Sequence, residues 1–264
     1  MSWLEVRRGH APMAEPGILG ITAGAGLAAV LVIIFQPDAG IWTLSAAAAV
    51  GALAVFGLVY GLSARGGLRA DRLVLVGIGV WSGATALITL ILVATNPWNL
   101  ALALTWLSGS TYGRTLPQVL PVLLALVAIA PSAVAAHREL DLMALDDDTP
   151  CLLGVRLRRA RLGALTGGAV LASTAVSAIG VVGFVGLVAP HAARALVGSR
   201  HLWVLPTSGL LGAALVSIAD TIGRTILAPG QIPAGLVTAL VRTPYFIWLL
   251  WRFRTTRTVC TAAR

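Results

Sequence analysis

The chain has 264 residues, of which 58% are hydrophobic and only 11% are charged. A soluble protein of this length typically carries about twice that charged fraction. The formal net charge of +9 comes from arginine alone, and the arginines lie between apolar blocks, which argues against a nucleic-acid-binding role. Cys151 and Cys260 lack the spacing of a metal site or a disulfide framework. The composition predicts a membrane protein.

The apolar blocks predict a polytopic, all-α membrane protein that forms one domain over residues 1–264. About 20 helical residues cross a hydrocarbon core of ~30 Å, and the short alternation typical of a barrel does not occur. Residues 1–10 are polar, so no cleavable signal peptide is expected. Eight spans are predicted, at 17–36, 41–62, 72–94, 116–136, 161–180, 181–197, 203–227 and 234–252.

The sixth predicted span is short. It follows the fifth at Gly180 without a polar loop, which is typical of a broken or re-entrant helix buried in protein. Five glycines fit close helix packing in lipid, namely Gly163, Gly167, Gly168, Gly209 and Gly212.

The arginines predict the orientation. With the N-terminus in the cytoplasm, sixteen arginines lie in or beside cytoplasmic segments. Only Arg114 and Arg224 lie outside, and Arg242 falls inside the last span. Both termini are therefore expected in the cytoplasm, including a tail at 253–264.

The longest polar segment, 137–160, is acidic first and basic last, with leucines interleaved. It could form a pair of short amphipathic helices at the membrane face that bind a partner. A solvated loop with an arginine anchor before the next span is the alternative.

No enzyme site is expected, because the chain has no Ser-His-Asp order, no His-Glu-x-x-His motif and no phosphate-binding loop. His191, next to Pro190, could be a proton relay or a packing residue. Asp220 and Arg224 are four residues apart, so they share a helix face and could pair. That pair could be structural or functional.

Three stretches resemble the FecCD-type permeases, the membrane subunits of ABC importers for ferric siderophores, haem and cobalamin. The C-terminal stretch carries Gly183 to His191 with Arg194, then Asp220 with Arg224, then Pro233 to Trp248. Ala14 to Gly20 resembles the family's Asn-Pro-Leu-Ala-Glu-Pro-Gly motif, and Leu145 to Val155 resembles its cytoplasmic coupling segment. The resemblance covers most of the chain in order, and the family's first two spans have no counterpart in it.

The resemblance implies a type II importer permease in the bacterial cytoplasmic membrane that carries an iron-siderophore or similar metal chelate. It implies pairing with a second permease copy or a paralogue, an ATPase subunit that holds ATP and Mg, and an extracytoplasmic substrate-binding protein that docks on Arg224. The implied coupling residues, within 137–160, are Leu145, Asp146, Asp147, Asp148, Leu153 and Gly154. The implied path and packing residues are Glu15, Pro16, Gly17, Gly183, Gly186, Pro190, His191, Asp220, Pro233 and Gly235. This chain itself would bind no cofactor or metal.

The sequence departs from the family pattern at several positions. Asp146 to Asp148 replace Gly-Glu-Glu, Pro150 could shorten the coupling helix, and Arg242 replaces a small residue. A membrane-buried arginine costs about 2.5 kcal/mol or more. There are two alternative functions. The chain could be an N-terminally truncated remnant that no longer transports, or it could be an ion-coupled secondary carrier.

Overall fold

The computed structural model describes residues 20–64, 70–111, 113–143, 157–226 and 232–240, and their regular secondary structure is entirely helical. The helices are α1 (Ile21–Phe35), α2 (Ile41–Ala64), α3 (Ala70–Val93), α4 (Pro97–Leu107), α5 (Leu116–Ala135), α6 (His137–Met143), α8 (Leu157–Ile179), α9 (Val185–Val197) and α10 (His201–Ile226). Residues 234–240 are helical as well.

Five of the predicted spans correspond to helices that are long and apolar enough to cross a membrane: α2, α3, α5, α8 and α10. Helices α1 and α9 are apolar but shorter, with 15 and 13 residues. The last predicted span, 234–252, lies mostly outside the described residues. Helix α4 was not predicted from the sequence. Asn96 caps it by accepting a hydrogen bond from the Asn99 N–H at 2.9 Å.

The predicted break between the fifth and sixth spans is confirmed. Helix α8 ends at Ile179, and Gly180 has a left-handed φ of 79°. Residues 181–184 are not helical, and Phe184, which is buried, has a φ of 77°. Helix α9 would be about 20 Å long at 1.5 Å per residue, which is too short for a hydrocarbon core of ~30 Å.

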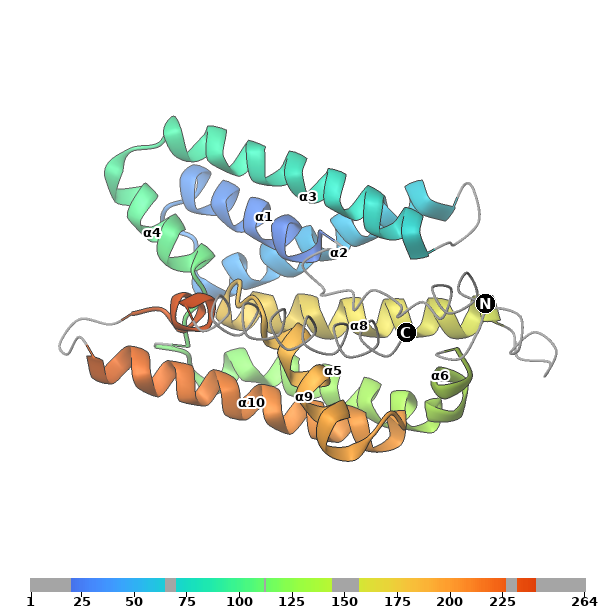
Figure 1. Ribbon diagram of the computed structural model, residues 1–264. Helices are drawn as coiled ribbons and strands as arrows, with labels where there is room; N and C mark the ends of the chain where they lie inside the picture. The colour runs from blue at the N-terminus through green and yellow to red at the C-terminus, as the bar shows by residue number, and fades with distance from the viewer. Residues whose placement is uncertain (1–19, 65–69, 112, 144–156, 227–231, 241–264) are drawn as a thin grey trace, which may run out of the picture.

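Helix α8 lies between two groups of helices (Figure 1). On one side it packs against α1 and α2, and α1 in turn packs against α3 and α4. On the other side it packs against α5 and α6, and α10 packs along α9. Helix α4, the start of α5 and the end of α10 lie at one end of the bundle, the α4 end, while α6 lies at the opposite end, the α6 end (Figure 1).

The backbones of α1 and α2 approach each other closely. A Cβ added to Gly24 would be 2.5 Å from the Gly51 carbonyl oxygen, and one added to Gly51 would be 2.5 Å from the Gly24 oxygen. Small residues in such pairs let helices approach closely in lipid. This pair was not predicted from the sequence.

Of the five glycines predicted to pack closely, Gly167 and Gly212 do so, with added Cβ atoms 3.3 Å from Ile129 and Val185 respectively. The prediction is not borne out at Gly163, Gly168 and Gly209, where no described atom would lie within 4 Å. A glycine pattern alone does not show which face of a helix meets a neighbour.

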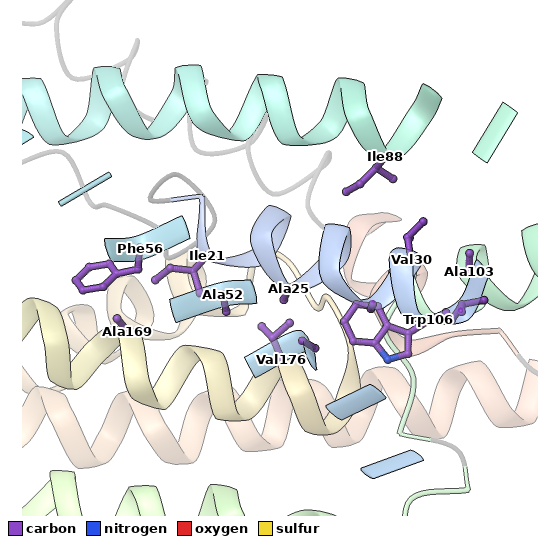
Figure 2. Packing of buried hydrophobic residues seen from close by; sticks show 13 residues of the cluster. Ile21, Ala25, Val30, Ala52, Phe56, Ile88, Ala103, Trp106, Ala169 and Val176 are labelled. Carbon is purple, nitrogen blue, oxygen red and sulfur yellow. The ribbon is translucent and has the colours of Figure 1, made fainter. Parts of the chain in front are cut away.

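The main core joins α1, α2, α3, α4 and α8 (Figure 2). Ile21 and Val30 of α1 are almost fully buried, and Trp106 of α4 and Val176 of α8 pack into the same cluster. By contrast, α5 has many exposed leucines and valines.

Hydroxyl groups on the exposed helix faces form hydrogen bonds within their own helix. Thr85 and Thr89 donate to the carbonyl oxygens of Trp81 and Thr85, respectively. These surfaces suit contact with lipid.

Candidate functional site

Four non-adjacent segments meet at the α4 end of the bundle: 108–111 after α4, 180–184 between α8 and α9, the end of α10, and 232–238. We call this meeting point the junction. Backbone hydrogen bonds connect its segments. The Ser110 N–H donates to Ile179 O at 2.8 Å, the Gly235 N–H to Gly109 O at 3.2 Å, and the Ile232 N–H to Gly223 O at 3.1 Å. The junction thereby provides partners for backbone groups that lie outside helices.

Glycine is required at several positions of the junction. Gly109 and Gly180 have φ angles of 65° and 79°, which other residues rarely adopt. A Cβ on Gly235 would lie 2.0 Å from the Ser108 carbonyl oxygen, and one on Gly223 would lie 2.4 Å from the Ile232 oxygen. The segments can approach this closely only because these positions lack a side chain.

The predicted pair of Asp220 and Arg224 is confirmed. Arg224 Nε donates to Asp220 Oδ2 at 2.7 Å, with the Arg224 side chain 45% exposed. The other carboxylate oxygen of Asp220 accepts a hydrogen bond from Thr111 Oγ1. Asp220 therefore connects the loop after α4 to the end of α10, and it holds a partly exposed guanidinium beside the junction.

The remaining predicted path residues are spread over the junction and α9. Gly183 lies in the linker before α9, and Pro233 precedes the helical residues 234–240 and accepts the Leu236 N–H at 3.0 Å through its carbonyl oxygen. Gly186 and Pro190 lie within α9. His191 is half-buried, and its side chain makes no hydrogen bond or ion pair with any described residue.

Two groups of predicted site residues lie outside the described residues. Glu15, Pro16 and Gly17 belong to 1–19. The coupling residues Leu145, Asp146, Asp147, Asp148, Leu153 and Gly154 belong to 144–156. Arg242 also lies outside. Helix α6 forms the described beginning of the polar segment 137–160 and agrees with the expectation of a short helix there.

At the α6 end, Asp141 of α6 contacts the first residue of α10. Its Oδ1 accepts the His201 backbone N–H at 2.9 Å and lies 2.6 Å from His201 Nδ1. The first backbone N–H groups of a helix lack partners within the helix and favour a negative charge. The backbone hydrogen bond from His201, with smaller contributions from its side chain, lowers the pKa of Asp141. Sequence reasoning missed this contact, since Asp141 and His201 are 60 residues apart.

The chemistry that this arrangement offers is binding and positioning. Within the described ranges, no group of three or more His, Cys, Asp or Glu residues could hold a metal ion. The carboxylate of Asp220 is already engaged by Thr111 and Arg224.

The loop after α4 was not predicted from the sequence either. Its signals are the Asn96-Pro97 helix start and Gly109 between two serines.

A comparison with known protein families matches residues 10–252 of this chain to the FecCD transport family. The chain belongs to this family. Among its relatives is the iron(3+)-hydroxamate import system permease protein FhuG of Bacillus subtilis (strain 168), which is 38% identical over 247 residues, covering 91% of this chain and 74% of the relative. The hemin transport system permease protein HmuU of Yersinia pestis is 36% identical over 253 residues, covering 93% and 75%.

The fold agrees with the family assignment. A solved structure described as an inward-facing conformation of a metal-chelate type ABC transporter superposes with a TM-score of 0.82 at 26% identity. The match covers 91% of this chain and 77% of that chain. The all-helical fold and the resemblance expected from the sequence are both confirmed, and this FecCD protein is a multi-pass membrane protein.

The first prediction concerns the junction. Gly235→Ala is expected to lower the thermal unfolding temperature in detergent, because its Cβ would overlap the Ser108 carbonyl group and separate the two segments. Overpacking of this kind costs about 1–3 kcal/mol. The matched control is Gly209→Ala on α10, where no described atom lies within 4 Å of the added Cβ. Equal unfolding temperatures for the two variants would contradict the close contact.

The second prediction concerns Asp141. A carboxylate with a lowered pKa stabilises the fold above its ordinary pKa of about 3.9, and this stabilisation is lost as the pH falls through the lowered value. Asp141→Asn should therefore be less stable than the parent at pH 7 by about 0.5 kcal/mol, since solvent screens this partly exposed group. The difference should shrink below pH ~4.

Thermal unfolding in detergent at several pH values measures this difference. Glu139→Gln on the same helix is the control, because the Glu139 side chain is exposed and makes no hydrogen bond or ion pair with a described residue. A deficit in Asp141→Asn that stays constant down to strongly acidic pH would argue against the charge of Asp141 as its cause.

Proposed function

We propose that this protein is the membrane permease subunit of an ATP-driven importer for a ferric siderophore or a similar metal chelate. The observation that carries the proposal is the family match over residues 10–252, in which the relatives are named for import of iron hydroxamates and hemin. Two permease copies, or this chain and a paralogue, would pair around a central path. The permease would perform no chemistry itself, and ATP with Mg would bind to a separate ATPase subunit.

The proposed orientation places the α4 end outside the cell and the α6 end in the cytoplasm. The arginine distribution supports it. Arg114 and Arg224 lie at the α4 end, whereas Arg138, Arg194 and Arg200 lie around α6 and the turn between α9 and α10 at the opposite end. Loops rich in arginine favour the cytoplasmic side. Both termini would then be cytoplasmic.

Transport would require two packings of the same helices, one open to each side, with ATP favouring one of them through its differential affinity. Short and interrupted helices in a membrane protein permit such rearrangements. Helices α8 and α9, separated by residues 180–184, provide an interrupted pair of this kind. The secondary-carrier alternative is less well supported, because it needs an available carboxylate at mid-depth, whereas Asp220 lies near a helix end and is engaged by Arg224 and Thr111.

The third prediction concerns the substrate-binding protein. Arg224→Ala is expected to weaken its docking about fivefold, because a partly exposed cation beside the junction would lose its attraction for an acidic partner surface. Binding of the purified substrate-binding protein to the reconstituted permease measures the effect. Arg200→Ala, an exposed arginine at the opposite end, serves as the control. An affinity unchanged by Arg224→Ala would remove Arg224 from the docking surface.

The fourth prediction concerns the ATPase. Deletion of 145–154, or the charge reversal Asp147→Lys, is expected to abolish co-purification of the ATPase subunit and ATP-driven uptake of radiolabelled ferric chelate into proteoliposomes. Deletion of the tail 255–264 is the control. A complex that assembles at full yield without 145–154 would refute this contact. Uptake that follows an ion gradient and ignores ATP would favour a secondary carrier, and assembly without any uptake by the intact chain would favour a non-transporting remnant.

A further inference from the structure

A cavity of about 410 Å³ lies at the α4 end of the bundle, beside the junction, since Ser110 of the junction is one of its lining residues. It is partly open, and it is bordered by the end of α1, the start of α2, the helix α4 and the loop that follows α4. Most of its wall is apolar and comes from residues such as Val32, Leu44 and Leu102. Polar groups come from Gln36, Thr105, Ser110 and Arg114. The cavity thus combines an apolar wall with one cationic group.

Arg114 is the cation of this cavity. Its Nε donates to the Ser110 carbonyl oxygen at 3.3 Å, and no described carboxylate lies within ion-pair distance of it. Burial lowers the pKa of Arg114, but a guanidinium remains charged in proteins. A half-buried cation without a neighbouring anion is costly, and an anionic ligand would offset that cost.

Trp106 forms a buried part of the cavity wall. The residue is only 6% exposed, and its indole Nε1 has no acceptor among the described residues. A buried donor left unpaired costs about 1–3 kcal/mol. Trp106 and Arg114 therefore both line the cavity and both have hydrogen-bond donors that lack partners among the described residues. Figure 2 shows Trp106 within the core cluster.

Large aromatic side chains adjoin the cavity in the chain. Phe35 precedes the lining residue Gln36, Trp42 follows the lining residue Ile41, and Trp98 lies in the first turn of α4. All three are more than half exposed. Exposed tryptophans at helix ends are typical of the level of lipid headgroups. The cavity therefore lies where the apolar surface of the bundle meets the headgroup region.

We propose that this cavity binds one anionic phospholipid, with the phosphate at Arg114 and the upper acyl chain along the apolar wall formed by α2 and α4. A guanidinium forms strong, charge-assisted hydrogen bonds with a phosphate group, and a concave apolar wall with few polar groups fits a small amphiphile better than a flat protein surface. The bound lipid would hold α1, α2 and α4 together beside the junction.

The proposal is tested by native mass spectrometry of the full-length protein, offered phosphatidylglycerol and phosphatidylcholine with identical acyl chains. The parent protein should retain phosphatidylglycerol preferentially. Arg114→Gln should reduce this retention about fivefold, as expected for the loss of one arginine near a headgroup. Arg114→Lys, which keeps the charge, should retain most of the preference, and Arg200→Gln at the α6 end should retain all of it.

Three results would overturn the proposal. The first is an equal retention of the two lipids by the parent protein. The second is an unchanged preference in an Arg114→Gln variant that elutes as the parent does in size-exclusion chromatography. The third is displacement of the lipid by a competitor at a concentration similar to that of the lipid. Displacement by soluble glycerol phosphate would assign the cavity to a free anion, and displacement by an acidic partner protein would assign it to a protein contact.

Discussion

The structure depends on one constraint: backbone N–H and C=O groups inside a bilayer must find partners within the protein. Between α8 and α9 the chain leaves the helical conformation, and the backbone there loses its local partners. The loop after α4 supplies one partner, because the Ser110 N–H donates to the carbonyl oxygen of Ile179, the last residue of α8. The segment 232–238 then bonds to that loop through Gly235 and Gly109. The non-helical segments thus provide hydrogen-bond partners for one another's backbone groups. Glycine is needed where these backbones come into contact.

This junction gives the α4 end of the molecule its functional character. Asp220 holds Thr111 of the loop and Arg224 of α10, so the proposed docking residue is positioned by the same loop that satisfies the helix break. At the opposite end, Asp141 connects α6 to the start of α10. Helix α10 therefore runs without interruption from a contact beside the polar segment 137–160 to the proposed docking surface. A shift at one end of a rigid helix reaches the other end, which suits a permease that responds to partners on both sides.

The cavity beside Arg114 adds lipid to this arrangement. It borders α1 and α2, whose backbones approach closely at Gly24 and Gly51, and α4, whose end enters the junction. In lipid there is little hydrophobic driving force between helices, so packing and specific polar contacts decide how they associate. A bound anionic lipid would add such a contact at a place where the described protein offers Arg114 no carboxylate.

The sequence by itself determined the membrane character, the approximate positions of five of the eight predicted spans, the break at Gly180 and the pairing of Asp220 with Arg224. Each of these follows from local composition or from the spacing of side chains on one helix. Only the tertiary structure decided that Thr111 bonds Asp220 across 109 residues and that Asp141 caps α10 across 60. It also decided which glycines lie in close contact with a neighbouring segment. Gly24, Gly51 and Gly235 do, whereas Gly163, Gly168 and Gly209 do not. The physical reason is that such contacts depend on which faces and which breaks meet in the packed bundle, and no local period in the chain encodes that choice.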